Sequence, residues 1–124
     1  MSKSPSFVVT LGYNKNNENN VTVAFTAALG AIQKGHRTAI ILLVDGVHVA
    51  TRGYVDSIDI GAPFRPVKDL LAEYLQNGGM IKVCSACLKH NHIAEDTLLR
   101  EAEVINLPDV IDLLDDAQTT LQLN

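Results

Sequence analysis

A chain of 124 residues falls in the range of about 100–150 residues that one domain usually occupies, and it can bury a core without metals or disulfides. Hydrophobic residues make up 47% of it and charged residues 19%, a balance that excludes a disordered chain. Its net charge of −4, with no cluster of Lys and Arg, lacks the electrostatic footprint of a nucleic-acid binder. We expect one domain over residues 1–124 and no nucleic-acid partner.

No segment predicts a membrane span or an export signal. The longest apolar run, Ala39 to Val44, is far shorter than the roughly 20 residues that cross a bilayer. The start, Met1 to Ser6, has no apolar signal region after its lysine. We therefore expect no membrane partner and a cytoplasmic location, where thiols are kept reduced and a structural disulfide is not expected.

The first part of the chain predicts two strands and a helix. Residues 6–11 are rich in β-formers and stop at Gly12, and the polar residues 13–20 predict a loop. Apolar residues at helical spacing predict a helix over 21–34. Residues 38–44 are continuously apolar, which is typical of a central parallel strand covered on both faces.

Residues 45–65 have no clear periodicity. Such a long irregular stretch indicates a binding loop, a lid or an oligomer contact, with Arg52 as a candidate contact for an anion or a partner. A packed loop is the alternative. An amphipathic helix follows from Pro66 and ends at Gly78.

The rest of the chain repeats the strand-helix pattern. We expect a strand over 80–84, a helix of about two turns ending near Asn91 or His92, a strand over 102–107, a helix over 108–117 and a strand over 119–123. Because parallel strands need a helix to return the chain, this order predicts an α/β fold. The expected architecture is a three-layer sandwich with a parallel sheet of about five strands and flavodoxin-like βα repeats. In such sheets, sites form at the carboxyl ends of the strands.

Cys84 falls where a predicted strand gives way to a helix, at such a carboxyl end. A thiol at a helix N-terminus lies near backbone N–H groups that favour the thiolate, whereas a buried cysteine at the same place is inert. Cys87 follows three residues later and could resolve an oxidised Cys84 through a C-x-x-C disulfide. The neighbouring candidates for ligand binding are Asn14, Asp45, Ser85 and His90.

No metal or cofactor is expected. Cys84, Cys87, His90 and His92 are residue types that zinc accepts, but their spacing is not that of a standard zinc site. Asp45 would either orient a substrate or simply turn the chain together with the glycine after it, and the turn is favoured. Neither of the glycine-rich phosphate-binding motifs is present.

Three segments carry a family resemblance. They are Ala39–Ala50, a strand followed by Asp-Gly-Val; Gly78–Cys87, which contains Gly-x-x-x-x-Val-Cys-x-x-Cys; and Ala102–Asn106. Together they resemble the DsrE/DsrF/TusD/YchN family. The resemblance implies a YchN-like three-layer fold that assembles into homo-oligomers: dimers, trimers or hexamers. In the sulfur-relay members it also implies a cysteine that carries a persulfide, and Cys84 matches that cysteine by position.

Cys87 matches a second cysteine of YchN-like members, so the chain is most similar to that branch. The resemblance implies a sulfur carrier, or a sulfurtransferase, with a persulfide on Cys84 and with sulfur donor and acceptor proteins as partners. The alternative is a non-catalytic oligomeric module that binds a small ligand or a protein and has a structural or redox-sensing C-x-x-C. The short helix of the family commonly ends in Arg-Gly, whereas Asn91 and His92 occupy these positions here, which removes a positive charge and a permissive glycine.

Overall fold

The sheet at the centre of the molecule has five parallel strands in the order β4-β3-β2-β1-β5. The computed structural model describes residues 4–123. The strands are β1 (Phe7–Leu11), β2 (Thr38–Leu42), β3 (Met80–Cys84), β4 (Ala102–Ile105) and β5 (Thr119–Leu123). The predicted α/β class and the five-stranded parallel sheet are confirmed.

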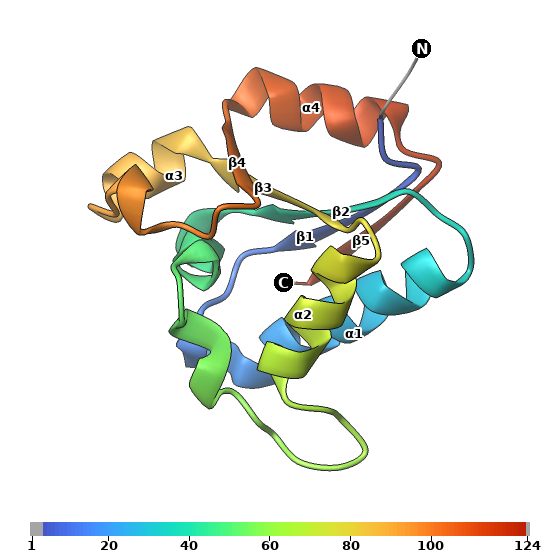
Figure 1. Ribbon diagram of the computed structural model, residues 1–124. Helices are drawn as coiled ribbons and strands as arrows, with labels where there is room; N and C mark the ends of the chain where they lie inside the picture. Colours follow the sequence, from blue (N-terminus) through green and yellow to red (C-terminus); the bar gives the residue numbers. More distant parts are fainter. Residues whose placement is uncertain (1–3, 124) are drawn as a thin grey trace.

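Helices cover both faces of this sheet (Figure 1). The α-helices are α1 (Glu18–Gln33), α2 (Val67–Gln76), α3 (Ser85–His90) and α4 (Leu107–Asp116). Four short 3-10 helices are η1 (Lys15–Asn17), η2 (Val44–Ala50), η3 (Tyr54–Ser57) and η4 (Glu95–Thr97). Helices α1 and α2 lie on one face and α4 lies on the opposite face, as the three-layer prediction requires (Figure 1).

The strand order explains which helix covers which face. From β1 to β4 the chain steps across the sheet in one direction, and from β4 to β5 it returns to the far edge. Right-handed crossovers place connections of opposite direction on opposite faces. The return helix α4 is therefore separated from α1 and α2 by the sheet. It begins with a capping box, in which Asn106 accepts from the N–H of Asp109 and Asp109 accepts from that of Asn106.

The main hydrophobic core lies between the sheet and the α1/α2 layer. Alternate strand residues such as Val9, Ile40 and Val83 point into it and are fully buried. Phe25 of α1 meets Tyr74 of α2 edge to face, with ring centroids 6.3 Å apart. A smaller core on the other face consists of Val8, Ile41, Ile105 and Val110.

Within the stretch over residues 45–65, the part up to Ile58 packs against the main core, as the packed-loop alternative predicts, whereas residues 59–65 are largely exposed. Its buried side chains are Val47, Val49, Ala50, Val55 and Ile58. Arg52 donates to the carbonyl oxygens of Asp96 and Leu98, each at 2.9 Å, so its guanidinium ties two loops together. No helix between residues 4 and 123 combines the length and the hydropathy needed to cross a membrane.

Candidate functional site

The two cysteines lie one helical turn apart where β3 passes into α3. Cys84 is the last residue of β3 and the N-cap of α3, and Cys87 is in the first turn of the helix. Both are free thiols, but their surroundings differ. Cys84 has an exposed fraction of 0% and belongs to the main core, whereas Cys87 is half-buried.

Cys87 lines a cavity of about 340 Å³ between the end of β2 and helix α3. Its walls are Val44, Asp45, Ala86, Cys87, His90 and Asn91. The cavity therefore lies at the carboxyl ends of two adjacent parallel strands, where sites form in open α/β sheets. It combines an apolar wall with a carboxylate, an imidazole and an amide around one thiol.

The turn after β2 presents a backbone donor to this thiol. The N–H of Val44 donates to Sγ of Cys87 at 3.1 Å. Val44 has a φ of 56°, a left-handed conformation that is strained for a β-branched residue. Gly46 closes the turn by donating to the carbonyl oxygen of Leu43 at 2.8 Å. A Cβ on Gly46 would overlap the carbonyl oxygen of Leu11, so only glycine fits there.

The pKa of Cys87 lies above the ordinary value of a thiol. Burial is the largest cause, because it disfavours the charged thiolate. The thiol of Cys84 beside it and the carboxylate of Asp45 act in the same direction, while the N–H of Val44 opposes them. Cys87 is therefore largely a neutral thiol at pH 7.

The other end of α3 also contacts the Val44 turn. Nδ2 of Asn91 lies 2.8 Å from the carbonyl oxygen of Cys87 and 3.4 Å from that of Val44. His92 follows with a φ of 57°, in the position where helices usually have glycine. Its N–H donates to the carbonyl oxygen of Lys89 and that of Ile93 to Leu88, which is the Schellman pattern. The cap is formed although glycine is absent.

Residues 6–123 match the model of the DsrE/DsrF-like family. The chain belongs to this family. The family is associated with sulfur relay in general, which agrees with a thiol as the centre of the site. No curated protein sequence matches the chain.

Three solved structures share the fold of this DsrE/DsrF-like protein. The YchN protein from E. coli is 14% identical with a TM-score of 0.77, and the match covers 94% of this chain and 97% of that one. A protein of unknown function from Methanobacterium thermoautotrophicum is 13% identical with a TM-score of 0.68, covering 94% and 95%. A conserved protein of unknown function from Bacteroides thetaiotaomicron is 18% identical with a TM-score of 0.64, covering 94% and 92%. These identities establish the fold and not the activity.

The structure brings together only some of the residues singled out in the sequence. Cys87, Asp45 and His90 line the cavity, whereas Cys84 is buried behind it. Ser85 is half-buried outside the lining. Asn14 lies elsewhere: its side chain caps η1 by accepting from the N–H of Asn16.

Val44 and Asn91 are cavity residues that the sequence did not mark as ligand-binding. Val44 ends the apolar run of β2 and directly precedes the Asp-Gly turn, so its place at a strand end was the available signal. Asp45 belongs to the turn and also lines the cavity. Within residues 4–123, no three His, Cys, Asp or Glu side chains are arranged to hold a metal ion.

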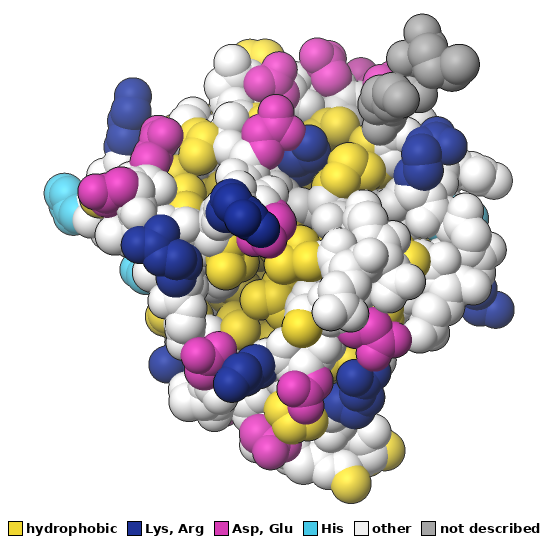
Figure 2. All heavy atoms as spheres, viewed as in Figure 1, with side chains coloured by type: hydrophobic (Ala, Val, Ile, Leu, Met, Phe, Trp, Pro, Cys, Tyr) yellow, Lys and Arg dark blue, Asp and Glu magenta, His cyan; other side chains and the backbone are white. Residues whose placement is uncertain are grey.

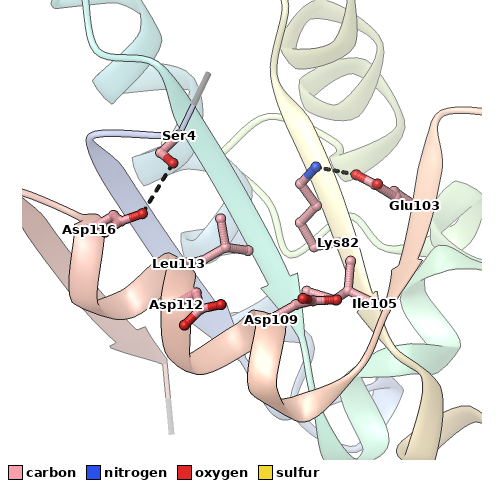
Figure 3. A pocket seen from close by; sticks show the side chains of 8 residues that line it. All are labelled: Ser4, Lys82, Glu103, Ile105, Asp109, Asp112, Leu113 and Asp116. Carbon is pink, nitrogen blue, oxygen red and sulfur yellow. Dashed lines mark hydrogen bonds and ion pairs between the residues drawn. The ribbon is translucent and has the colours of Figure 1, made fainter. Parts of the chain in front are cut away.

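A second cavity, of about 300 Å³, lies on the face of the sheet that α4 covers (Figure 3). Lys82 of β3 pairs there with Glu103 of β4, and Ser4 donates to Asp116 at 3.3 Å. Asp109 and Asp112 of α4 also line it. Acidic side chains gather over α4 on the surface as well (Figure 2). This cavity contains no thiol.

Proposed function

We propose that this DsrE/DsrF-like protein is a sulfur carrier that holds a persulfide on Cys87, with Cys84 as the second thiol of the pair. The observation that carries the proposal is the position of Sγ of Cys87, which lines a cavity and accepts the N–H of Val44 at 3.1 Å. A donor can reach this sulfur. Cys84, the carrier favoured by the sequence, is 0% exposed, so loading on Cys84 would first require a local opening.

Sulfur transfer at such a thiol is a balanced exchange. The Cys87 thiolate attacks the outer sulfur of a donor persulfide, a new sulfur–sulfur bond forms, and the donor leaves as a thiolate. In the second step an acceptor thiolate attacks the outer sulfur on Cys87 and restores the Cys87 thiolate. Neither step needs an external oxidant or reductant. The N–H of Val44 supports the anionic forms of the sulfur.

The cavity rim supports a protein as donor or acceptor. The side chain of Val44 has an exposed fraction of 59% beside the sulfur, and Ala86 is exposed next to it. Exposed apolar groups around a reactive atom are typical of a surface that a partner covers. Sulfur donor and acceptor proteins, homo-oligomers and the cytoplasmic location stay predictions.

The test is to incubate the reduced protein with glutathione persulfide and to measure its intact mass. We expect a gain of one sulfur atom in the native chain and in Cys84→Ser, and no gain in Cys87→Ser. The two serine variants are matched controls, because they differ only in which thiol of the pair remains. Loading that persists in Cys87→Ser and is lost in Cys84→Ser would move the carrier to Cys84. No gain in any variant would reject the carrier function.

A redox-sensing pair is the second candidate, and the closeness of the two thiols favours it. Cys84 lies beside Cys87, and both burial and this neighbour hold the pKa of Cys87 above its ordinary range. A raised pKa slows both sulfur uptake and oxidation, because both begin from the thiolate, but two adjacent thiols still close into a disulfide once one of them is oxidised. Mild oxidation that yields an internal Cys84–Cys87 disulfide, in a protein that takes up no sulfur, would support this candidate over the carrier.

A further inference from the structure

The side chain of Val44 does little to compensate for the strain in its backbone. Its φ of 56° places a β-branched residue in the left-handed region, where its backbone is strained. Its side chain is largely exposed and therefore gains little from packing. A strained residue persists only when its surroundings hold it in place, so the contacts of its peptide groups are the relevant ones.

Two contacts hold the turn from the β2 side. Gly46 donates to the carbonyl oxygen of Leu43 and packs so closely against Leu11 that no side chain fits. The N–H of Leu43 also donates to the carbonyl oxygen of Leu11, at 3.0 Å. These contacts fix Leu43 and Gly46. Val44 is also the first residue of the 3-10 helix η2, whose i→i+3 bonding engages its carbonyl group from within the turn.

Asn91 adds a contact to this carbonyl group from outside the turn, from helix α3. Its Nδ2 lies 2.8 Å from the carbonyl oxygen of Cys87 and 3.4 Å from that of Val44. One amide group therefore joins the residue that bears the sulfur to the residue that bears the backbone donor. The backbone N–H of Asn91 donates to the same Cys87 carbonyl at 3.0 Å, which fixes the position of the amide.

We propose that Asn91 is a positioning residue, whose side-chain amide bridges the carbonyls of Cys87 and Val44 and keeps the strained Val44 N–H directed at Sγ of Cys87. This deepens the proposed function, on which it rests for its biological meaning, because the same N–H meets the sulfur that would be loaded. Without the bridge, the Val44 peptide relaxes out of the left-handed region and the hydrogen bond to Sγ is lost.

The test measures the ionisation of the Cys87 thiol and does not depend on sulfur loading. In a Cys84→Ser background Cys87 is the single thiol, since the chain has two cysteines. The rate of its alkylation by iodoacetamide against pH gives the midpoint of its ionisation. We expect Asn91→Leu to raise this midpoint by about one pH unit, because a hydrogen bond to the thiolate is lost. That is about a tenfold lower alkylation rate below the midpoint.

A rescue variant separates positioning from a merely structural role. Adding Val44→Gly to Asn91→Leu should return the midpoint to within a few tenths of a pH unit of the background, because glycine occupies the left-handed region without strain and keeps its N–H. His92→Gly, in the same helix cap, is the matched control: it should raise the urea concentration at which half of the protein is unfolded and leave the ionisation midpoint of Cys87 unchanged.

Circular dichroism first checks that each variant is folded, and Asn91→Ala replaces Asn91→Leu if the latter is not. An ionisation midpoint that stays within about 0.2 pH units of the background in the folded Asn91 variant, or a shift that Val44→Gly does not reverse, would overturn the proposal. The outcome is independent of the carrier function, because a midpoint shift with rescue in a protein that takes up no sulfur would keep the positioning role and reject the carrier.

Discussion

Two cavities of similar volume, about 340 and 300 Å³, lie at different places around the same sheet. The cavity at Cys87 combines a thiol, an exposed valine and a strained peptide at the carboxyl ends of two strands. The cavity under α4 is lined by carboxylates and one lysine, and its Lys82 is already paired with Glu103. Size does not distinguish them, whereas their chemistry does. The Cys87 cavity is the better candidate site because it places a thiol beside a strained backbone.

The largest expected effect concerns the turn at the Cys87 cavity. Gly46→Ala should lower the free energy of unfolding by about 3 kcal/mol, because its Cβ would overlap the carbonyl oxygen of Leu11 and the backbone must move. Urea unfolding followed by circular dichroism measures this. Where the variant still folds, the displaced Val44 N–H should also slow the alkylation of Cys87.

Gly30→Ala is the matched control for this substitution. A Cβ on Gly30, within α1, meets no atom within 4 Å, so alanine should raise the free energy of unfolding by about 0.5–1 kcal/mol. If Gly46→Ala lowers the free energy of unfolding by less than about 1 kcal/mol, the turn can adjust to a side chain, and the Cys87 cavity is then not distinguished by a rigid backbone.

An intermediate effect concerns the two thiols. Iodoacetamide should label Cys87 at least about 100-fold faster than Cys84 in the native chain, because the buried thiol reacts only after a local opening. The midpoint for Cys87 should lie above the value of about 8.5 of a free thiol, since burial raises its pKa. Fragment-ion masses distinguish the two labelled positions.

The raised pKa of Cys87 also makes the stability of the protein depend on pH. The unfolded thiol ionises near pH 8.5, before the folded one, so the free energy of unfolding should fall as pH rises from there to the folded pKa. Cys87→Ser should lose this part of the pH dependence. Equal labelling rates for the two cysteines at pH 8 would contradict the burial of Cys84 on which the assignment of the carrier depends.

The smallest effect is expected at the cavity under α4. Lys82→Met removes the ion pair with Glu103, whose side chain is 62% exposed, and keeps the apolar stem over the sheet. The free energy of unfolding should change by less than about 1 kcal/mol, and the alkylation rate of Cys87 should not change. A changed alkylation rate of Cys87 in this variant would mean that the two cavities are coupled and do not behave as separate sites.

Periodicity and turn residues made most of the fold predictable from the sequence. The bounds of β3 and β5 agree with the expectation, and the other elements differ by a few residues for identifiable reasons. Helix α1 begins at Glu18 because Asn17 caps it by accepting from the N–H of Asn20. Strand β2 ends at Leu42, earlier than its apolar run, because Val44 already turns into η2. Hydrophobicity alone does not mark that change of direction.

The site was predictable in place but not in detail. The end of β3 and the C-x-x-C pair follow from the strand-helix order and from the family motif. Which of two cysteines in one helical turn faces the cavity depends on how the Val44 turn packs against α3. The left-handed backbone at Val44 has no sequence signal, because a β-branched residue rarely adopts it. At His92 the signal is the helix end where the family commonly has glycine. Asn91 was noticed as a departure from the family, and the structure shows its contacts.

The position of β5 has a consequence for synthesis on the ribosome. In the pairing of β1 with β5, Phe7 lies beside Thr119. The first strand of the sheet to be synthesised therefore pairs along one edge with the last one. Contacts so distant along the chain form late. Until then one edge of β1, with the fully apolar Val8 and Val9, stays open to strands of other chains. The nascent protein is therefore most exposed to aggregation just before β5 is complete, and a chaperone that shields this edge would raise its yield.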